Sequence, residues 1–172
     1  MKSLNIQPIT WQKVYRTWKK NEDHDFWRAH YQPRGFSSWP EWRKNYIQPL
    51  GLEKLKWQTG ELKNIKDILN FYGGPFKAWK KYFYKNKNSL TFKQLALLSK
   101  IKNNKRFKKL INNFPGQTTL IAIQRKNKII IIDGMHRATA LALMINKKQK
   151  IKTKINIAFA EYHKKTLPLL GQ

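Results

Sequence analysis

The sequence predicts an α+β fold, in which a small mixed β-sheet follows a helical, aromatic-rich N-terminal extension. Apolar residues recur at helical spacing over the first two-thirds of the chain, and the pattern becomes strand-like after Phe114-Pro115-Gly116. A strand–turn–helix unit then spans 129–145. Helices and strands that are segregated along a chain are typical of α+β architecture. We expect one compact unit, with the extension over 1–60 and a core over 61–172.

The N-terminal extension is distinguished by its aromatic residues. Eleven of them lie within 1–60: Trp11, Tyr15, Trp18, Phe26, Trp27, Tyr31, Phe36, Trp39, Trp42, Tyr46 and Trp57. Trp11, Tyr15 and Trp18 are spaced i, i+4 and i+7, which places them on one face of a helix. We expect the aromatic residues to form core. The alternative is that they stack bases together with the interleaved arginines.

Capping signals predict where several helices begin and end. Asp23 or Asp25 is expected to cap a short helix over 26–31, and Pro40 to lie in the first turn of the next helix, before Gly51. Three further patterns predict the elements that follow. They are an apolar stripe over 62–69, a capping box at Thr91 and Gln94, and a basic amphipathic helix over 100–109.

Strand-like segments are confined to the last third of the chain. Residues 118–124 and 129–132 flank a polar turn, and 151–157 alternates isoleucine or threonine with lysine or asparagine. The four consecutive isoleucines of 129–132 predict a short strand that is buried on both faces.

The most informative stretch is the turn that follows this buried strand. Asp133-Gly134 is a turn dipeptide, and the next residues, up to Ile145, are mostly strong helix formers. Free backbone N–H groups and the positive end of the helix dipole meet at such a first turn, which therefore suits an anion. His136 and Arg137 add side-chain donors there. The sequence thus predicts a phosphate site.

The Asp-Gly-x-His-Arg element at 133–137 resembles that of the ParB/sulfiredoxin-like superfamily, whose members carry Gly-x-His-Arg or Gly-x-Arg-Arg at such a turn. In nucleotide-using members, among them sulfiredoxins, ParB partition proteins and an archaeal free-serine kinase, the element contacts nucleotide phosphates. The resemblance is specific over 118–145 and extends to Tyr162. It implies a sheet of the ParB/sulfiredoxin type. It also implies a site for ATP or another nucleoside triphosphate at Gly134, Met135, His136 and Arg137.

Thr139 lies one turn further along the helix and is a further candidate for phosphate contact, although the flanking Ala138 and Ala140 favour tight packing instead. One departure from the family limits the chemistry. Sulfiredoxins place their nucleophilic cysteine where this chain has Met135, and the chain contains no cysteine. Repair of a sulfinic acid by a thiolate and thiolate metal sites are therefore excluded.

Asp133 is the candidate for acid–base or metal chemistry. Its carboxylate is expected to hold Mg²⁺ beside bound phosphates or to orient His136 or Arg137, and the alternative is a helix cap. His136 is a candidate hydrogen-bond donor to a phosphate oxygen, or a candidate general acid. A phosphotransferase also needs a group that orients the acceptor, for which we select Glu61, with Glu41 and Glu53 as equivalent candidates by position.

Composition adds a second class of partner. The 36 Lys and Arg residues against 9 Asp and Glu give a formal net charge of +27, which attracts polyanions such as nucleic acid. The alternative explanation of the charge is that an AT-rich genome produces frequent Lys, Asn and Ile without selection for binding. No apolar run is long enough to span a membrane, residues 1–8 contain no apolar signal core, and the sequence has no cysteine, so we expect a cytoplasmic protein without a targeting segment.

Two classes of function follow. The first is an Mg²⁺-dependent phosphotransferase or NTPase that uses ATP or another nucleoside triphosphate and an unknown acceptor. The second is a ParB-like DNA- or RNA-binding protein that uses the basic surface. No DNA-reading helix is recognisable, which favours the first class, while the charge favours the second. A nuclease is less well supported because clustered carboxylates are missing from the sequence.

Overall fold

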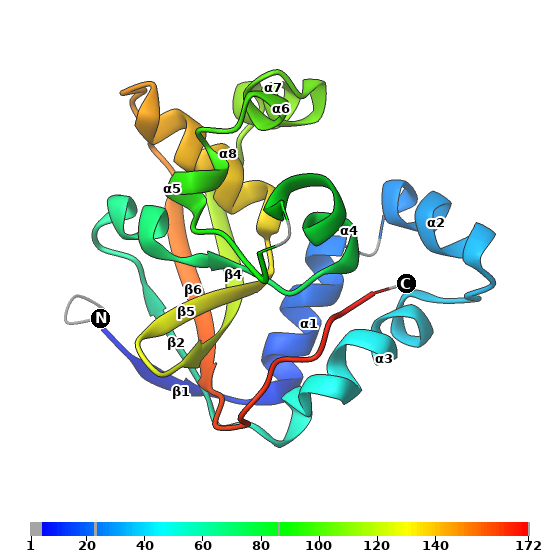
Figure 1. Ribbon diagram of the computed structural model, residues 1–172. Coiled ribbons are helices and arrows are strands. Elements are labelled where there is room, and N and C mark those ends of the chain that lie inside the picture. The colour runs from blue at the N-terminus through cyan, green and yellow to red at the C-terminus, as the bar shows by residue number, and fades with distance from the viewer. Residues whose placement is uncertain (1–4, 23, 86, 172) are drawn as a thin grey trace.

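A computed structural model describes residues 5–22, 24–85 and 87–171 and confirms the α+β class (Figure 1). Its centre is a mixed six-stranded sheet with the order β1-β2-β6-β4-β5-β3. The strands are β1 (Gln7–Ile9), β2 (Trp57–Glu61), β3 (Tyr72–Gly73), β4 (Gln117–Arg125), β5 (Lys128–Asp133) and β6 (Lys154–Glu161). β4 with β6 and β3 with β5 are parallel pairs, and the other neighbours are antiparallel.

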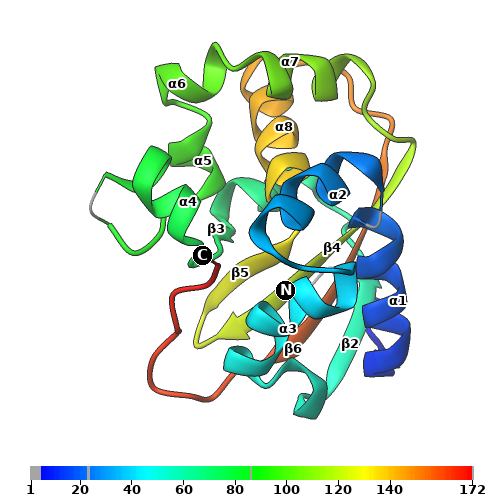
Figure 2. The ribbon, with the colours of Figure 1, turned by 90° about the vertical axis from the view of Figure 1, so that its right-hand side faces the viewer.

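Helices cover both faces of this sheet (Figures 1 and 2). The α-helices are α1 (Trp11–Glu22), α2 (Asp25–Tyr31), α3 (Trp39–Leu50), α4 (Lys77–Trp79), α5 (Phe92–Leu95), α6 (Ser99–Lys102), α7 (Lys105–Asn112) and α8 (Met135–Asn146). Shorter turns are η1 (Gln32–Arg34), η2 (Leu52–Lys54), η3 (Ile65–Asn70) and the π-helical η4 (Lys80–Tyr84). Among the residues described, no helix combines the length and apolarity that crossing a membrane requires.

The isoleucines of β5 show why both faces need cover. Ile129 and Ile131 pack into a core with α8 and with the short helices α5 to α7. Ile130 and Ile132 face the other way, into a core formed by α1, α3 and their tryptophans. Successive side chains of a strand point to opposite faces, so this apolar run is buried on both sides, as predicted.

Most of the N-terminal aromatic residues are core, as expected. Trp18, Trp39, Trp42 and Trp57 are each less than 5% exposed and cover the α1 and α3 face of the sheet. Phe26 is the exception, since 52% of its surface is exposed. The extension also contributes β1 and β2 to the sheet, which the sequence did not predict. β2 reads Trp-Gln-Thr-Gly-Glu, and its pairing with β6 joins residues about a hundred positions apart.

Several expected elements differ in length or start. The stripe over 62–69 forms the shorter η3, in which Asn64 accepts from the N–H of Lys66. The basic segment 100–109 is divided into α6 and α7, because the side chain of Asn104 caps the second helix. The third expected strand starts at Lys154 rather than at residue 151 and continues to Glu161. The capping box at Thr91 is confirmed, on a helix of only one turn.

The predicted caps of the first helices are confirmed in part. Pro40 lies in the first turn of α3 behind the Ser38 cap, and Gly51 ends that helix with a φ of 62°. The expectation that Asp25 caps α2 is wrong, because His24 occupies that position and the Asp25 carboxylate instead pairs with Arg28 at 3.0 Å. The alternative cap, Asp23, lies outside the described residues.

Candidate functional site

The strand–turn–helix unit forms as the sequence predicts. β5 ends at Asp133, Gly134 adopts a φ of 92°, and α8 begins at Met135. A side chain at Gly134 would be strained by that φ, and its Cβ would lie 2.5 Å from Cδ2 of Leu120. Glycine is therefore required at this turn by both backbone conformation and space.

Asp133 and Arg137 form an ion pair across the turn. Nη2 of Arg137 lies 2.9 Å from Oδ2 of Asp133, and Nδ2 of Asn21 in α1 donates to the same oxygen at 2.9 Å. Nη1 of Arg137 donates to the Thr118 hydroxyl at 2.6 Å and to the Thr119 carbonyl at 3.1 Å. The geometry supports the expectation that Asp133 orients Arg137. It does not support a cap, because α8 has no side-chain cap hydrogen bond.

A second buried ion pair lies beside the first. Arg43 of α3 contacts Oε2 of Glu22 through Nη2 at 2.5 Å and through Nε at 2.6 Å, and Trp39 donates to the same oxygen. The Arg43 guanidinium also lies 3.7 Å from the ring centroid of Trp42. Burial raises the pKa of Glu22, the nearby charge of Asp133 raises it further, and Arg43 opposes both. The end of α1 therefore brings both ion pairs together at the motif.

His136 lies among aromatic rings rather than in a polar setting. Its ring centroid is 5.3 Å from that of Trp79, 5.6 Å from Phe107 and 6.4 Å from Trp27. Burial, reinforced by the charges of Arg106 and Arg137, lowers the pKa of His136 to about 3. The imidazole is therefore neutral near pH 7. A neutral imidazole can donate one hydrogen bond, which suits the expected contact with a phosphate oxygen, and the role of general acid stays a prediction.

Arg106 completes this cluster from α7. Its guanidinium carbon lies 4.3 Å from the ring centroid of Phe26 and 5.4 Å from that of Trp27. A cation is thereby held close to His136 through ring contacts rather than through a carboxylate. A ligand at the first turn of α8 would meet Arg106 and the partly exposed edge of Arg137, 17% of whose side chain is accessible.

The first turn of α8 also presents backbone donors. Over the described part of the chain, the N–H groups of Met135, His136 and Arg137 have no acceptor, whereas the N–H of Ala138 bonds to the Gly134 carbonyl at 2.8 Å. Three adjacent free amides are the arrangement that binds phosphate at helix N-termini. These amides, His136 and Arg137 are the donors that the structure brings together.

Two predicted phosphate contacts point elsewhere. The Met135 side chain is buried, and its sulfur accepts from the N–H of Gly74 at 3.2 Å, so only its backbone faces the site. The Thr139 hydroxyl is fully buried and donates to the Met135 carbonyl at 2.8 Å. The packing role that its alanine neighbours favour therefore accounts for Thr139.

Glu61 is not brought to the motif. It ends β2, so β6 and β4 lie between it and β5, and its carboxylate pairs with Lys154 at 3.2 Å. Glu53 is an exposed residue of η2, and the Glu41 carboxylate accepts from Ser37 just before α3. None of these three carboxylates contacts His136 or Arg137.

Five residues that surround the motif were not predicted as part of the site, namely Asn21, Trp79, Arg106, Phe107 and Thr118. No local signal connects them to it, since they lie between 19 and 112 positions from the residues they contact. Within the described ranges, no group of three or more His, Asp or Glu side chains is placed to hold a metal ion.

Comparisons with protein-family models, with curated proteins and with solved structures found no match.

Proposed function

We propose that this chain is a nucleotide-binding protein of the ParB/sulfiredoxin-like type, which holds the phosphates of ATP or another nucleoside triphosphate at the first turn of α8. The observation that carries the proposal is the set of three unpaired amides at Met135, His136 and Arg137. They adjoin a guanidinium that Asp133 and Thr118 hold in place. Backbone amides and a fixed arginine are preorganised donors for phosphate oxygens.

The neutral state of His136 fits this role. A neutral imidazole can donate to a phosphate oxygen, and the approach of an anion would raise its pKa from the low value that burial and the two arginines impose. Phe26, with more than half of its surface exposed, stacks with the Arg106 guanidinium, whose charge also lowers the pKa of His136. An aromatic face beside a phosphate site suits a nucleobase.

The proposed reaction is transfer of the terminal phosphoryl group to an acceptor or to water. Asn21 and Arg137 both bond to Oδ2 of Asp133, whereas Oδ1 has no partner among the residues that the structure describes. A single carboxylate together with phosphate oxygens is a usual ligand set for Mg²⁺, so Asp133 fits the role of a metal-holding residue. The metal would neutralise charge on the transferred group.

Replacement of His136 tests the proposal without changing the charge of the free protein. We expect His136→Leu to weaken ATP binding by at least about tenfold, because leucine cannot donate the hydrogen bond and a hydrogen bond to a charged group contributes about 1.5 to 3 kcal/mol. Isothermal titration calorimetry at about 150 mM salt, with and without Mg²⁺, measures the affinity and limits nonspecific attraction. His163→Leu is the matched control, since that histidine is exposed and lies beyond β6. Equal affinity in the wild type and both variants would overturn the proposal.

A further inference from the structure

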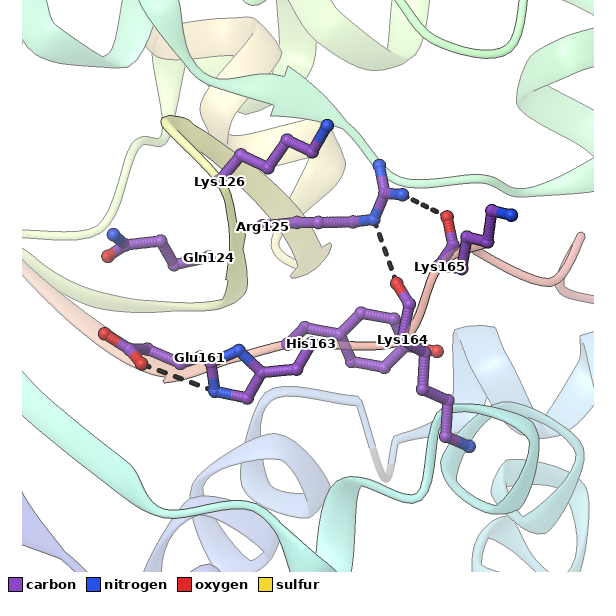
Figure 3. A pocket seen from close by; sticks show the side chains of 8 residues that line it. Gln124, Arg125, Lys126, Glu161, His163, Lys164 and Lys165 are labelled. Atoms are coloured by element: carbon purple, nitrogen blue, oxygen red, sulfur yellow. Dashed lines mark hydrogen bonds and ion pairs between the residues drawn. The ribbon is translucent and has the colours of Figure 1, made fainter.

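The opposite end of the sheet contains a hollow of about 420 Å³ between the β4–β5 hairpin and the segment that follows β6 (Figure 3). Four cationic residues line it, namely Arg125, Lys126, Lys164 and Lys165. Glu161 is the single carboxylate among the lining residues. This hollow is therefore strongly basic. It is separate from the motif, because the six residues of β5 span the roughly 17 Å that lie between the hairpin and the turn at Gly134.

The cations of the hollow are not neutralised by carboxylates. Nε of Arg125 donates to the Lys164 carbonyl at 3.2 Å, and its Nη2 donates to the Lys165 carbonyl. Glu161 pairs with His163 at 3.4 Å instead of with a lysine. Among the described residues, none of the four cations has a carboxylate partner. Arg125 thus fixes the 162–165 segment on the hairpin while its charge stays available to an anion.

A second hollow of about 310 Å³ continues the first. The two share Tyr162, His163 and Lys164, and the second reaches Lys54 and Glu53 in η2. The cationic side chains are consequently spread from the hairpin to η2 rather than gathered around one point. Tyr162 lines both hollows, and its buried hydroxyl has no hydrogen-bond partner among the described residues. An unsatisfied buried hydroxyl is unfavourable, and a ligand atom that accepts a hydrogen bond from it would remove this cost.

We propose that the two adjoining hollows form a groove that binds the sugar–phosphate backbone of a single-stranded nucleic acid. Spaced cations along a groove follow successive phosphates, whereas a single phosphate needs only one cluster of donors. The only aromatic side chain of the lining, apart from His163, is that of Tyr162, which is 2% exposed and cannot stack with a base. Binding therefore has no sequence preference. The formal charge of +27 adds attraction over the whole surface.

The test removes three charges from the groove while keeping Arg125 and its structural bonds. The groove variant is Lys126→Gln/Lys164→Gln/Lys165→Gln, and all three lysines are exposed. The matched control is Lys147→Gln/Lys150→Gln/Lys152→Gln, which removes the same charge from exposed lysines before β6, at its other end. Fluorescence anisotropy of a labelled oligothymidylate measures affinity over a series of salt concentrations.

We expect the groove variant to bind about tenfold more weakly than the control at about 100 mM salt. The slope of log affinity against log salt should fall by about 2 in the groove variant, because each phosphate contact on a single strand contributes about 0.7. Equal losses in both variants would show undirected charge attraction and overturn the proposal. It would also be overturned if inorganic tripolyphosphate, or a duplex of the same length, bound more tightly than the single strand.

Discussion

Cationic side chains lie at both ends of the β4–β5 strand pair, but among the described residues they have carboxylate partners at only one end. At the motif end, Arg137 and Arg43 are each paired with a carboxylate that is less than 10% exposed. At the hairpin end, Arg125 bonds only to carbonyl groups, and the neighbouring lysines are exposed. The difference separates two uses of positive charge. At the motif end the carboxylate fixes the position of Arg137 beside the unpaired amides, whereas at the hairpin end no carboxylate in the described part of the chain neutralises the cations.

This comparison is easiest to follow along the sheet. Figure 1 shows α8 leaving the sheet at one end of β5, while the β4–β5 hairpin and the segment after β6 meet at the other. The last turn of α1 and the helix α2 lie at the first of these ends, where Asn21 bonds to Asp133 and the Trp27 ring neighbours that of His136. The extension therefore contributes to both candidate sites, through α1 and α2 at the motif and through η2 at the second hollow of the groove.

The largest expected difference concerns stability. Arg43→Ala should lower the free energy of unfolding by about 3 to 5 kcal/mol, because it leaves the buried Glu22 carboxylate without its partner. Lys165→Ala should change it by less than about 0.5 kcal/mol, as surface substitutions generally do. Urea unfolding monitored by tryptophan fluorescence measures both. Similar losses in the two variants would mean that the ends do not differ as described.

Asp133→Asn should have an intermediate effect. We expect it to destabilise the protein by about 1.5 to 3 kcal/mol, the usual contribution of a hydrogen bond to a charged group, because Arg137 loses its charged partner. Under the proposed function, Mg²⁺ should strengthen ATP binding in the wild type and not in this variant, as calorimetry would measure. If Mg²⁺ acts equally on both proteins, Asp133 positions Arg137 but holds no metal.

The smallest expected effect is a pH dependence that originates at His136. Its folded-state pKa of about 3 lies below the usual 6.5, so the unfolded chain binds a proton that the folded chain excludes. Stability from this residue is therefore complete above pH 6.5 and falls as the pH decreases toward 3. The loss should reach up to about 2 kcal/mol by about pH 5.

His136→Gln should remove that part of the pH dependence. Glu22 acts in the opposite direction, because its raised pKa favours the folded state at low pH. The difference between the wild type and His136→Gln, rather than the wild-type curve alone, therefore isolates the histidine. Parallel stability curves for the two proteins between pH 5 and 7 would show that His136 is not desolvated as described.

The sequence predicted those features that depend on neighbouring residues. The β5–Gly134–α8 unit and the Thr91 capping box are encoded within a few positions, and both form as expected. The division of the helix over 100–109 was also readable, because Asn103-Asn104 is a capping signal that the basic stripe obscured.

Long-range contacts were not predictable in this way. Asn21 bonds to Asp133 across 112 positions, and Trp79 and Phe107 reach His136 only through the packing of α4 and α7 against α8. The pairing of β2 with β6 also joins residues about a hundred positions apart, and the sequence of β2 has no strand-like alternation. The environment that makes His136 neutral therefore had no local signal in the sequence.

The most direct test of nucleotide binding at the motif is an NMR titration of the wild-type protein with ATP, followed by backbone amide resonances. We expect the largest shifts at Gly134 to Arg137, because the unpaired amides of the first turn of α8 would donate to phosphate oxygens. The resonances of Lys126, Lys164 and Lys165 should shift less at about 150 mM salt. Shifts concentrated at the hairpin end, with Gly134 to Arg137 unchanged, would contradict the proposed function.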